Sequence, residues 1–323
     1  MRATLRCLRD GHFPAYAEVS VLVITPFFSR VRLALLPVLL AACAAERVEQ
    51  TPEDTSVAAP LVDDFQHEIP APGARRVASL NPAMTELVLA LGAGDRLVGR
   101  TSWDTYSPRL RSVRDLGAGL RPNVEAVLET RPDLVILYAS NDNAAAATRI
   151  RASGVPTLSI KLDRIAQFER AATLLGTALD AEERARAVVD SVHRTLASVR
   201  TAVAGLPRPR VFWHVWDSPI ITIGSGSFLH DLVEIAGGEN VYGDVGGPSP
   251  QVELEDIAQR APDIILAGPD GARRIRSDPR WRAIRAVRNN QVIVVDTLLV
   301  ARPSVRLGEA AATLATMLHP AQR

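Results

Sequence analysis

The sequence predicts an α/β protein that consists of two Rossmann-like lobes with parallel sheets, joined by one long α-helix. Short apolar segments alternate with amphipathic segments in both halves of the chain, which is typical of parallel α/β sheets. The segments that begin at Glu125 (EAVLETRPDLVIL) and at Glu255 (EDIAQRAPDIILA) share one order: acid, helix, basic residue, Pro-Asp, apolar strand. This correspondence indicates an internal repeat. A long helical pattern over residues 181–204 lies between the two copies.

Residues 1–42 have the features of a signal peptide. Arg30 and Arg32 precede a short apolar run, and Leu40 with the small residues Ala41 and Ala42 precedes Cys43. The run is too short to span a bilayer, which needs about 20 apolar residues. Because the pattern resembles the lipobox of bacterial lipoproteins, we expect Cys43 to be lipidated and to hold the protein at a membrane by its lipid. The alternative is the start of a buried helix that meets a cysteine by chance.

We expect the residues on either side of this apolar run to lie outside the folded lobes. Residues 1–30 exceed what a signal peptide needs, so Val31 is an alternative start and residues 1–30 would then be an over-extended gene model. Residues 43–74 are rich in proline, alanine and acids and lack hydrophobic periodicity. This composition predicts a flexible tether, with ordered structure beginning near Arg75.

The N-terminal lobe is expected over residues 75–163. Asn81 is positioned to cap a helix that stops at Gly92. The continuously apolar run 135–137 is typical of a buried parallel strand. The expected strands cover residues 76–80, 97–99, 134–138 and 157–160, and the expected helices cover residues 82–91, 124–130 and 144–153.

A helical connection is expected over residues 164–205, followed by a C-terminal lobe over residues 206–319. Residues 164–178 are amphipathic, and residues 180–183 (DAEE) read as a capping box that restarts the helix. Apolar residues then recur at three- and four-residue steps as far as Val199. In the C-terminal lobe the expected strands cover residues 210–215, 264–267 and 292–295, and the expected helices cover residues 227–236, 254–260, 281–287 and 307–318.

The composition argues against several classes of function. The formal net charge is +1, with acids and bases interspersed, which argues against an electrostatic nucleic-acid binder. The two cysteines, Cys7 and Cys43, precede the expected lobes, so no thiol chemistry is available there. The histidines show no metal-ligand spacing, and no Gly-x-Ser-x-Gly elbow places a nucleophile. Residues 224–227 (GSGS) lack the P-loop lysine. We therefore expect no catalytic residues, no metal site and no cofactor.

Four motifs carry a resemblance to a known family. They are RVASLNPAMTEL (76–87), RPDLV (131–135), GGENV (237–241) and APDII (261–265). In this order, around a central helix, they resemble the periplasmic binding proteins of ABC importers, in the branch that handles cobalamin, ferric siderophores and haem. The resemblance covers about residues 75–318 and is strongest to the cobalamin-binding members. It implies a small-molecule ligand and, as partners, a membrane permease with its ATPase; we expect a monomer.

The resemblance also implies how such a protein meets its permease. In this family one exposed glutamate on each lobe docks onto permease arginines, and by position these are Glu125 and Glu255. Charged pairs of this kind fix the orientation of a transient complex more than they add affinity. The alternative is that each is an acid in the first turn of a helix, favoured by the helix dipole.

The ligand is expected in a cleft between the lobes, at the carboxyl ends of the strands. Aromatic rings pack on a corrin or another flat, bulky ligand, and arginine binds carboxylate, amide or phosphate groups. Trp103, Tyr138 and Arg302 match pocket positions of the cobalamin-binding relatives, whereas two other aromatic positions are replaced by Gly119 and Ser249. The candidate ligand-binding residues are Trp103, Tyr106, Arg121, Tyr138, Trp216, Asp217 and Arg302.

Two functions from different classes follow. The first is a lipid-anchored, extracytoplasmic solute-binding protein that delivers a cobalamin-like or iron-chelate ligand to an ABC importer. The second is an extracytoplasmic α/β enzyme, esterase-like or chelate-processing. The missing nucleophile elbow argues against the enzyme.

Overall fold

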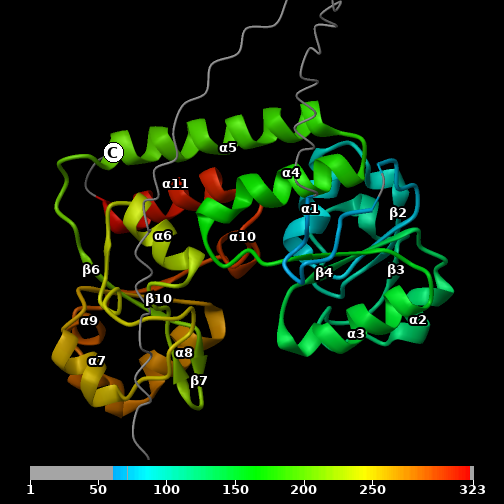
Figure 1. Ribbon diagram of the computed structural model, residues 1–323. Helices are drawn as coiled ribbons and strands as arrows, with labels where there is room; N and C mark the ends of the chain where they lie inside the picture. The colour runs from blue at the N-terminus through cyan, green and yellow to red at the C-terminus, as the bar shows by residue number, and fades with distance from the viewer. Residues whose placement is uncertain (1–60, 71, 321–323) are drawn as a thin grey trace, which may run out of the picture. The chain divides into compact units, whose positions relative to one another are not determined.

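The computed structural model describes residues 61–70 and 72–320. The predicted signal peptide, the lipidation site Cys43 and the first part of the predicted tether lie outside these residues. The described chain contains two parallel sheets with a helical connection between them in sequence (Figure 1). This confirms the predicted fold class.

The N-terminal lobe is built on a five-stranded parallel sheet with the order β3-β2-β1-β4-β5. Asn81 caps α1 as predicted, because its side chain accepts a hydrogen bond of 3.1 Å from the amide of Ala83. The strands are β1 (Val77–Ser79), β2 (Leu97–Arg100), β3 (Arg114–Asp115), β4 (Leu134–Tyr138) and β5 (Thr157–Ile160), and the helices are α1 (Pro82–Ala90), η1 (Gly94–Arg96), η2 (Pro108–Leu110), α2 (Val124–Glu129) and α3 (Asn141–Ala152).

The C-terminal lobe is built on a four-stranded parallel sheet with the order β11-β10-β6-β9, and a separate antiparallel hairpin follows β6. The side chain of Ser227 caps α6 by accepting a hydrogen bond from the amide of Leu229. The strands are β6 (Arg210–His214), β7 (Trp216–Asp217), β8 (Ile220–Ile221), β9 (Glu239–Asn240), β10 (Ile264–Ala267) and β11 (Val292–Val294), and the helices are α6 (Phe228–Ile235), α7 (Leu254–Arg260), α8 (Pro269–Ser277), η4 (Pro279–Ala283), α9 (Arg285–Arg288), α10 (Thr297–Val300) and α11 (Leu307–Leu318).

The helical connection consists of η3 (Ile165–Gln167), α4 (Phe168–Ala178) and the 22-residue helix α5 (Glu182–Val203). Figure 1 shows α5 running alongside α4 and α11, and these pairs are in contact. One face of α5 is buried, at Ala185, Val189, Val192, Leu196 and Val199. These side chains belong to a hydrophobic cluster that also contains residues of both lobes. The two lobes therefore share one continuous apolar core through the connecting helices.

The internal repeat has a structural cause at its Pro-Asp step. Asp133 accepts hydrogen bonds of 2.8 Å from the amides of Arg75 and Arg76, at the start of β1. Asp263 accepts a bond of 3.0 Å from the amide of Arg210, the first residue of β6. In each copy the aspartate thus ties the strand that follows it to the first strand of its lobe.

The chain before residue 75 differs from the prediction. The sequence pattern predicts ordered structure from near Arg75, but residues 61–70 already pack on the N-terminal lobe. Asp63 is completely buried, and its carboxylate accepts a bond of 2.9 Å from the amide of Ser159 in β5. Asp64 accepts a bond of 2.6 Å from the amide of Lys161. The two carboxylates hold this segment by accepting hydrogen bonds from amides along the edge strand β5 and just after it. Because the segment has a polar composition without periodicity, the sequence pattern does not predict this packing.

The predicted capping box at residues 180–183 is wrong. The N-cap of α5 is Ala181, without a side-chain hydrogen bond, and Asp180 has a left-handed backbone with φ of 55°. The break between α4 and α5 therefore comes from this backbone turn. Five further elements were not predicted, because all of them are short or polar: β3, β9, the β7–β8 hairpin, α8 and α10.

Candidate ligand-binding cleft

A cleft with a volume of about 320 Å³ draws its walls from both lobes. On the N-terminal side, its residues follow the carboxyl ends of β1, β4 and β5. On the C-terminal side, they follow β6 and include the first turn of α6. Most of the lining side chains are apolar. The lining residues are Asn81, Ala83, Tyr138, Leu162, Asp163, Val215, Ile223, Ser227, Phe228, Leu229, Pro248, Ser249 and Pro303.

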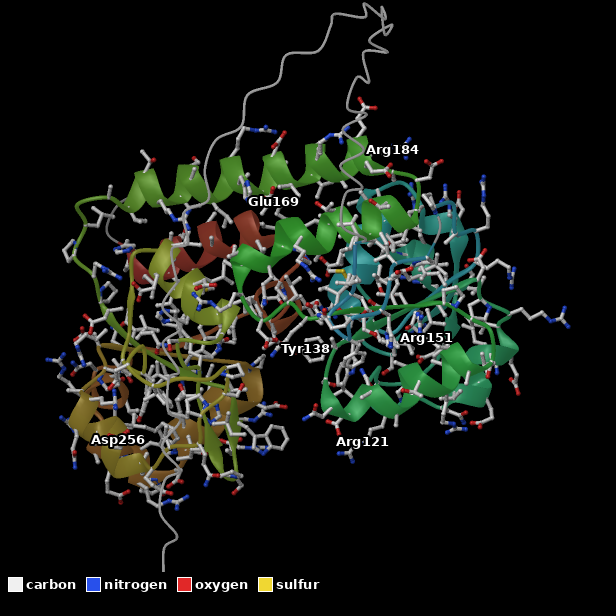
Figure 2. The ribbon with its side chains drawn as sticks, viewed as in Figure 1. Arg121, Tyr138, Arg151, Glu169, Arg184 and Asp256 are labelled. Atoms are coloured by element: carbon white, nitrogen blue, oxygen red, sulfur yellow. The ribbon has the colours of Figure 1, made fainter. Side chains whose placement is uncertain are left out.

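Tyr138 is the predicted ligand residue that the structure places directly in this wall. It is the last residue of β4, and Figure 2 shows it on the side of the N-terminal lobe that faces the other lobe. Its hydroxyl donates a hydrogen bond to Asp163, which also lines the cleft. Burial raises the pKa of the Tyr138 phenol, and the bond to Asp163 raises it further. Tyr138 therefore presents a neutral ring with its proton committed to Asp163.

Trp103 and Trp216 are large aromatic side chains that remain exposed. The exposed fraction is 58% for Trp103 and 59% for Trp216. Trp216 follows Val215 of the cleft wall, and the carbonyl oxygen of Trp103 is bound by Arg302, which precedes Pro303 of the wall. Neither indole is part of the cleft wall; each lobe therefore carries one tryptophan with more than half of its surface exposed.

Arg302 and Tyr106 lie in a buried cluster and are absent from the cleft wall. The Arg302 guanidinium donates to Glu86 at 3.1 Å and to the carbonyl oxygen of Trp103 at 2.5 Å. Its carbon Cζ lies 5.1 Å from the centre of the Tyr106 ring, within range of a cation–π contact. The Arg302 side chain is 10% exposed. Its donors are directed to protein groups.

The remaining two predicted ligand residues are held by ion pairs. Arg121 pairs with Asp142 at 2.6 Å, and its side chain is largely exposed. Asp217 pairs with Arg274 and lies 3.0 Å from Nε2 of His214. Burial lowers the pKa of His214, while Asp217 acts in the opposite direction.

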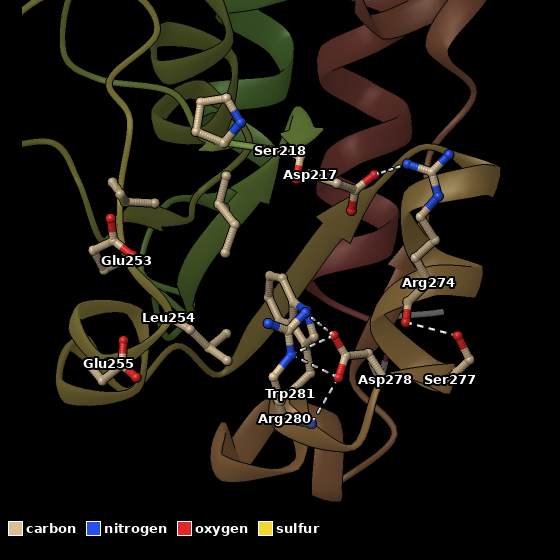
Figure 3. A pocket seen from close by; sticks show the side chains of 13 residues that line it. Asp217, Ser218, Glu253, Leu254, Glu255, Arg274, Ser277, Asp278, Arg280 and Trp281 are labelled. Carbon is tan, nitrogen blue, oxygen red and sulfur yellow. Dashed lines mark hydrogen bonds and ion pairs between the residues drawn. The ribbon is translucent and has the colours of Figure 1, made fainter.

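Asp217 belongs to a second cavity, of about 610 Å³, which lies within the C-terminal lobe (Figure 3). The cavity is bounded by the β7–β8 hairpin, the start of α7 and the end of α8. Its charged side chains include the pairs Asp217–Arg274 and Asp278–Arg280. The cavity is larger than the cleft between the lobes, but the acids and bases in its walls are suited to polar contacts. The apolar cleft fits a bulky organic ligand better.

The two predicted docking glutamates occupy matching places in the repeat, in the first turns of α2 and α7. Glu125 pairs with Arg149 of α3 at 2.6 Å, and its side chain is 69% exposed. A hydrogen bond from its own backbone amide lowers its pKa, and Arg149 lowers it further. Glu255 is exposed and lines the second cavity; no ion pair to it occurs among residues 61–70 and 72–320.

Two further properties concern the described residues only. Within them no cluster of three or more His, Cys, Asp or Glu side chains could hold a metal ion. None of their helices combines the length and apolar character that crossing a membrane requires.

Comparison with known proteins identifies the family. The family model described as periplasmic binding protein matches residues 77–298, which include both sheets and the connection between them. The chain belongs to the periplasmic binding protein family. Membership implies an extracytoplasmic location and a role in binding a solute, and it agrees with a cleft formed by two lobes.

Individual periplasmic binding proteins are similar over most of their length. An uncharacterized ABC transporter substrate-binding lipoprotein of Bacillus subtilis is 28% identical over 302 residues, which is 89% of this chain and 95% of that protein. The vitamin B12-binding protein of Vibrio cholerae is 28% identical over 257 residues, which is 77% of this chain and 91% of that protein.

Solved structures of periplasmic binding proteins share the fold. The haem-binding protein RhuT of Roseiflexus sp. RS-1 superposes with a TM-score of 0.71 at 24% identity, over 78% of this chain and 100% of its own. The vitamin B12-binding protein BtuF of Vibrio cholerae gives a TM-score of 0.69 at 24% identity, over 78% of this chain and 99% of its own.

Most residues of the cleft wall were not predicted from the sequence. Leu162 and Asp163 follow β5, and Phe228 opens α6 behind its Ser227 cap. The position of Asp163 after a buried strand was a usable signal. Pro248 and Pro303 lie in loops whose path depends on the packing of the whole lobe. No local sequence pattern therefore predicts that they line the cleft.

Proposed function

We propose that this protein is the solute-binding component of an ABC importer and that it captures a bulky, flat ligand between its lobes, either a corrinoid or an iron chelate such as haem or a ferric siderophore. The observation that carries the proposal is the apolar cleft shared by the carboxyl ends of both parallel sheets. Ligands of open α/β folds bind at this edge of the sheet.

The chemistry of the cleft supports a flat organic ligand. Tyr138 and Phe228 supply aromatic surface in the wall, and Trp103 and Trp216, one exposed indole on each lobe, would add to it. A volume of about 320 Å³ lies near the lower end of the range for organic ligands, so one edge of a macrocycle would enter while the rest meets the indoles. The B12-binding and haem-binding relatives support the same class of ligand.

The proposal extends to the partners and to the location. Cys43 would carry the lipid that holds the protein at the membrane, and Glu125 and Glu255 would dock onto the permease, which works with its ATPase. The lipoprotein among the relatives supports the anchor. The paired positions of the two glutamates in the repeat support the docking role.

Thermal unfolding with a panel of ligands tests the proposal. Cyanocobalamin, haemin and ferric siderophores are each added to the full chain, and ester hydrolysis is assayed in parallel. A ligand present at 100 times its Kd stabilises the folded state by about 2.7 kcal/mol. For a chain of this size that gain raises Tm by about 5 °C. A shift with one class and no hydrolysis supports the proposal. Ester turnover without any shift would favour the enzyme instead.

A further inference from the structure

A buried ion pair ties the segment between α10 and α11 to helix α1. Glu86 of α1 is 3% exposed, and Arg302 is 8% exposed. One oxygen of Glu86 accepts the 3.1 Å bond from Arg302, and the other accepts a bond of 2.5 Å from the hydroxyl of Ser304. Glu86 and Arg302 are 216 positions apart in the chain, so the pair connects the N-terminal lobe to the segment that leads out of the C-terminal sheet.

The same arginine holds the loop that carries Trp103. We call residues 101–106, between β2 and η2, the Trp103 loop. The guanidinium donates to the carbonyl oxygen of Trp103 at 2.5 Å and stands over the Tyr106 ring. The main chain of the loop is therefore fixed at the residue whose indole is exposed.

A second buried acid, the residue after Trp103, also holds the Trp103 loop. Asp104 is 1% exposed, and its carboxylate accepts bonds of 2.8 Å from the amide of Thr101 and 3.2 Å from the hydroxyl of Thr85. Thr85 and Glu86 are neighbours in α1. The loop thus has two attachments to α1, one direct through Asp104 and one that passes through Arg302.

We infer that Glu86 is a positioning residue for the ligand site: through Arg302 it fixes the Trp103 loop and couples the place of the Trp103 indole to the segment that leads out of the C-terminal lobe. The inference rests on the proposed function and assigns Arg302 to positioning rather than to ligand contact. A buried ion pair is weak evidence for stability, because desolvation offsets the attraction. This geometry instead supports a fixed arrangement of the groups around the ion pair.

The first test needs no ligand. In a Trp216→Phe background, Trp103 is the one exposed tryptophan, because Trp213 and Trp281 are 4% and 5% exposed. Glu86→Gln should then increase the fast, nanosecond part of the fluorescence anisotropy decay about twofold, since that timescale reports loop motion. In a Trp103→Phe background, which leaves Trp216 as the exposed indole, the same substitution should change nothing. An unchanged decay of Trp103 would overturn the inference.

A double variant and a control variant distinguish loss of positioning from a general folding defect. Glu86→Gln leaves a buried arginine without its carboxylate, which is destabilising. Glu86→Met with Arg302→Met removes both charges, and it should release the Trp103 loop in a protein that folds. Asp231→Asn breaks a different ion pair, between Asp231 and Arg164 at 2.5 Å, and should leave the Trp103 decay unchanged. A rigid Trp103 in the folded double-Met variant would contradict the inference.

Binding of cyanocobalamin and haemin supplies the link to the ligand. The probe that binds the protein without this substitution is used. Glu86→Gln should lower the affinity for that probe about tenfold, a change of about 1.4 kcal/mol. In a Trp103→Ala background the same substitution should have no further effect, whereas in a Trp216→Ala background it should keep its full effect. Equal effects in both backgrounds would refute positioning through Trp103. If no ligand of the panel binds, ferric siderophores included, the proposed function loses its support, whereas the anisotropy result still decides the positioning role.

Discussion

Truncation of an exposed tryptophan to alanine should weaken ligand binding by an amount that follows from its exposed area. A tryptophan side chain offers roughly 150–250 Å² of surface. The 58% of Trp103 that is exposed without ligand then corresponds to about 90–145 Å². At about 25 cal/mol per Å² this area is worth about 2–4 kcal/mol when a ligand covers it completely. Ordering the side chain costs about 0.5–1.5 kcal/mol, so Trp103→Ala should weaken binding by about 1–3 kcal/mol.

The same calculation applies to Trp216, which is 59% exposed. Titration calorimetry should therefore show a loss of affinity of about 5- to 150-fold for either variant. Because both indoles are exposed in the free protein, Tm should stay close to that of wild type.

Trp281 is the matched control for these variants. It is 5% exposed and packs in the core of the C-terminal lobe, so Trp281→Ala should lower the free energy of unfolding by about 3–5 kcal/mol. The fraction that remains folded should keep its affinity. The opposite result, in which Trp103→Ala and Trp216→Ala lower Tm and leave the affinity intact, would refute the reasoning.

Four other outcomes follow from the sequence and the structure together. Cys43→Ser should yield protein without lipid in the soluble fraction, and membrane-bound protein with an intact N-terminus would exclude the lipid anchor. Glu125→Arg together with Glu255→Arg should abolish uptake in transport assays and leave ligand affinity unchanged; undiminished uptake would remove the docking role. Scattering curves with and without ligand should nearly superpose, because the lobes share one apolar core through α5, whereas a marked contraction would indicate hinge closure. Finally, burial lowers the pKa of His214 below its ordinary value of 6.5, so the unfolded chain binds a proton there more readily. Stability should therefore fall as pH drops from about 7 to about 5, and His214→Asn should reduce this slope in denaturant titrations; equal slopes would contradict the assignment.

Much of the fold could be predicted from local patterns. The buried strands β4 and β10 are continuously apolar, and the Pro-Asp steps at 132–133 and 262–263 mark the repeat. The structure explains why those steps are diagnostic, since each aspartate binds backbone amides at the start of the first strand of its lobe. A motif with a fixed local function can be recognised without knowledge of the tertiary structure.

The candidate site could be predicted only in part. Strand ends led to Tyr138, which lies in the cleft wall, and to Trp103 and Trp216, which are exposed and whose contact with a ligand stays a prediction. The same reasoning placed Arg302 near the ligand, but the structure directs its guanidinium to Glu86 and to a backbone carbonyl. Which carboxylate an arginine binds across 216 positions depends on tertiary packing, which the sequence pattern does not contain. For the same reason the burial of Asp63 against β5 could not be foreseen from its polar surroundings.

The most direct test of the central claim, that the ligand binds between the two lobes, is to fill the cleft. Val215 is 45% exposed and lines the cleft, and Val294 is an exposed valine at the end of β11 that is absent from the cleft wall. Cyanocobalamin, haemin and a ferric siderophore are titrated into wild type, Val215→Trp and Val294→Trp by calorimetry. The ligand bound by wild type should lose at least about tenfold in affinity, about 1.4 kcal/mol, in Val215→Trp and should bind normally to Val294→Trp. Undiminished binding to Val215→Trp would place the ligand outside the cleft and contradict the claim.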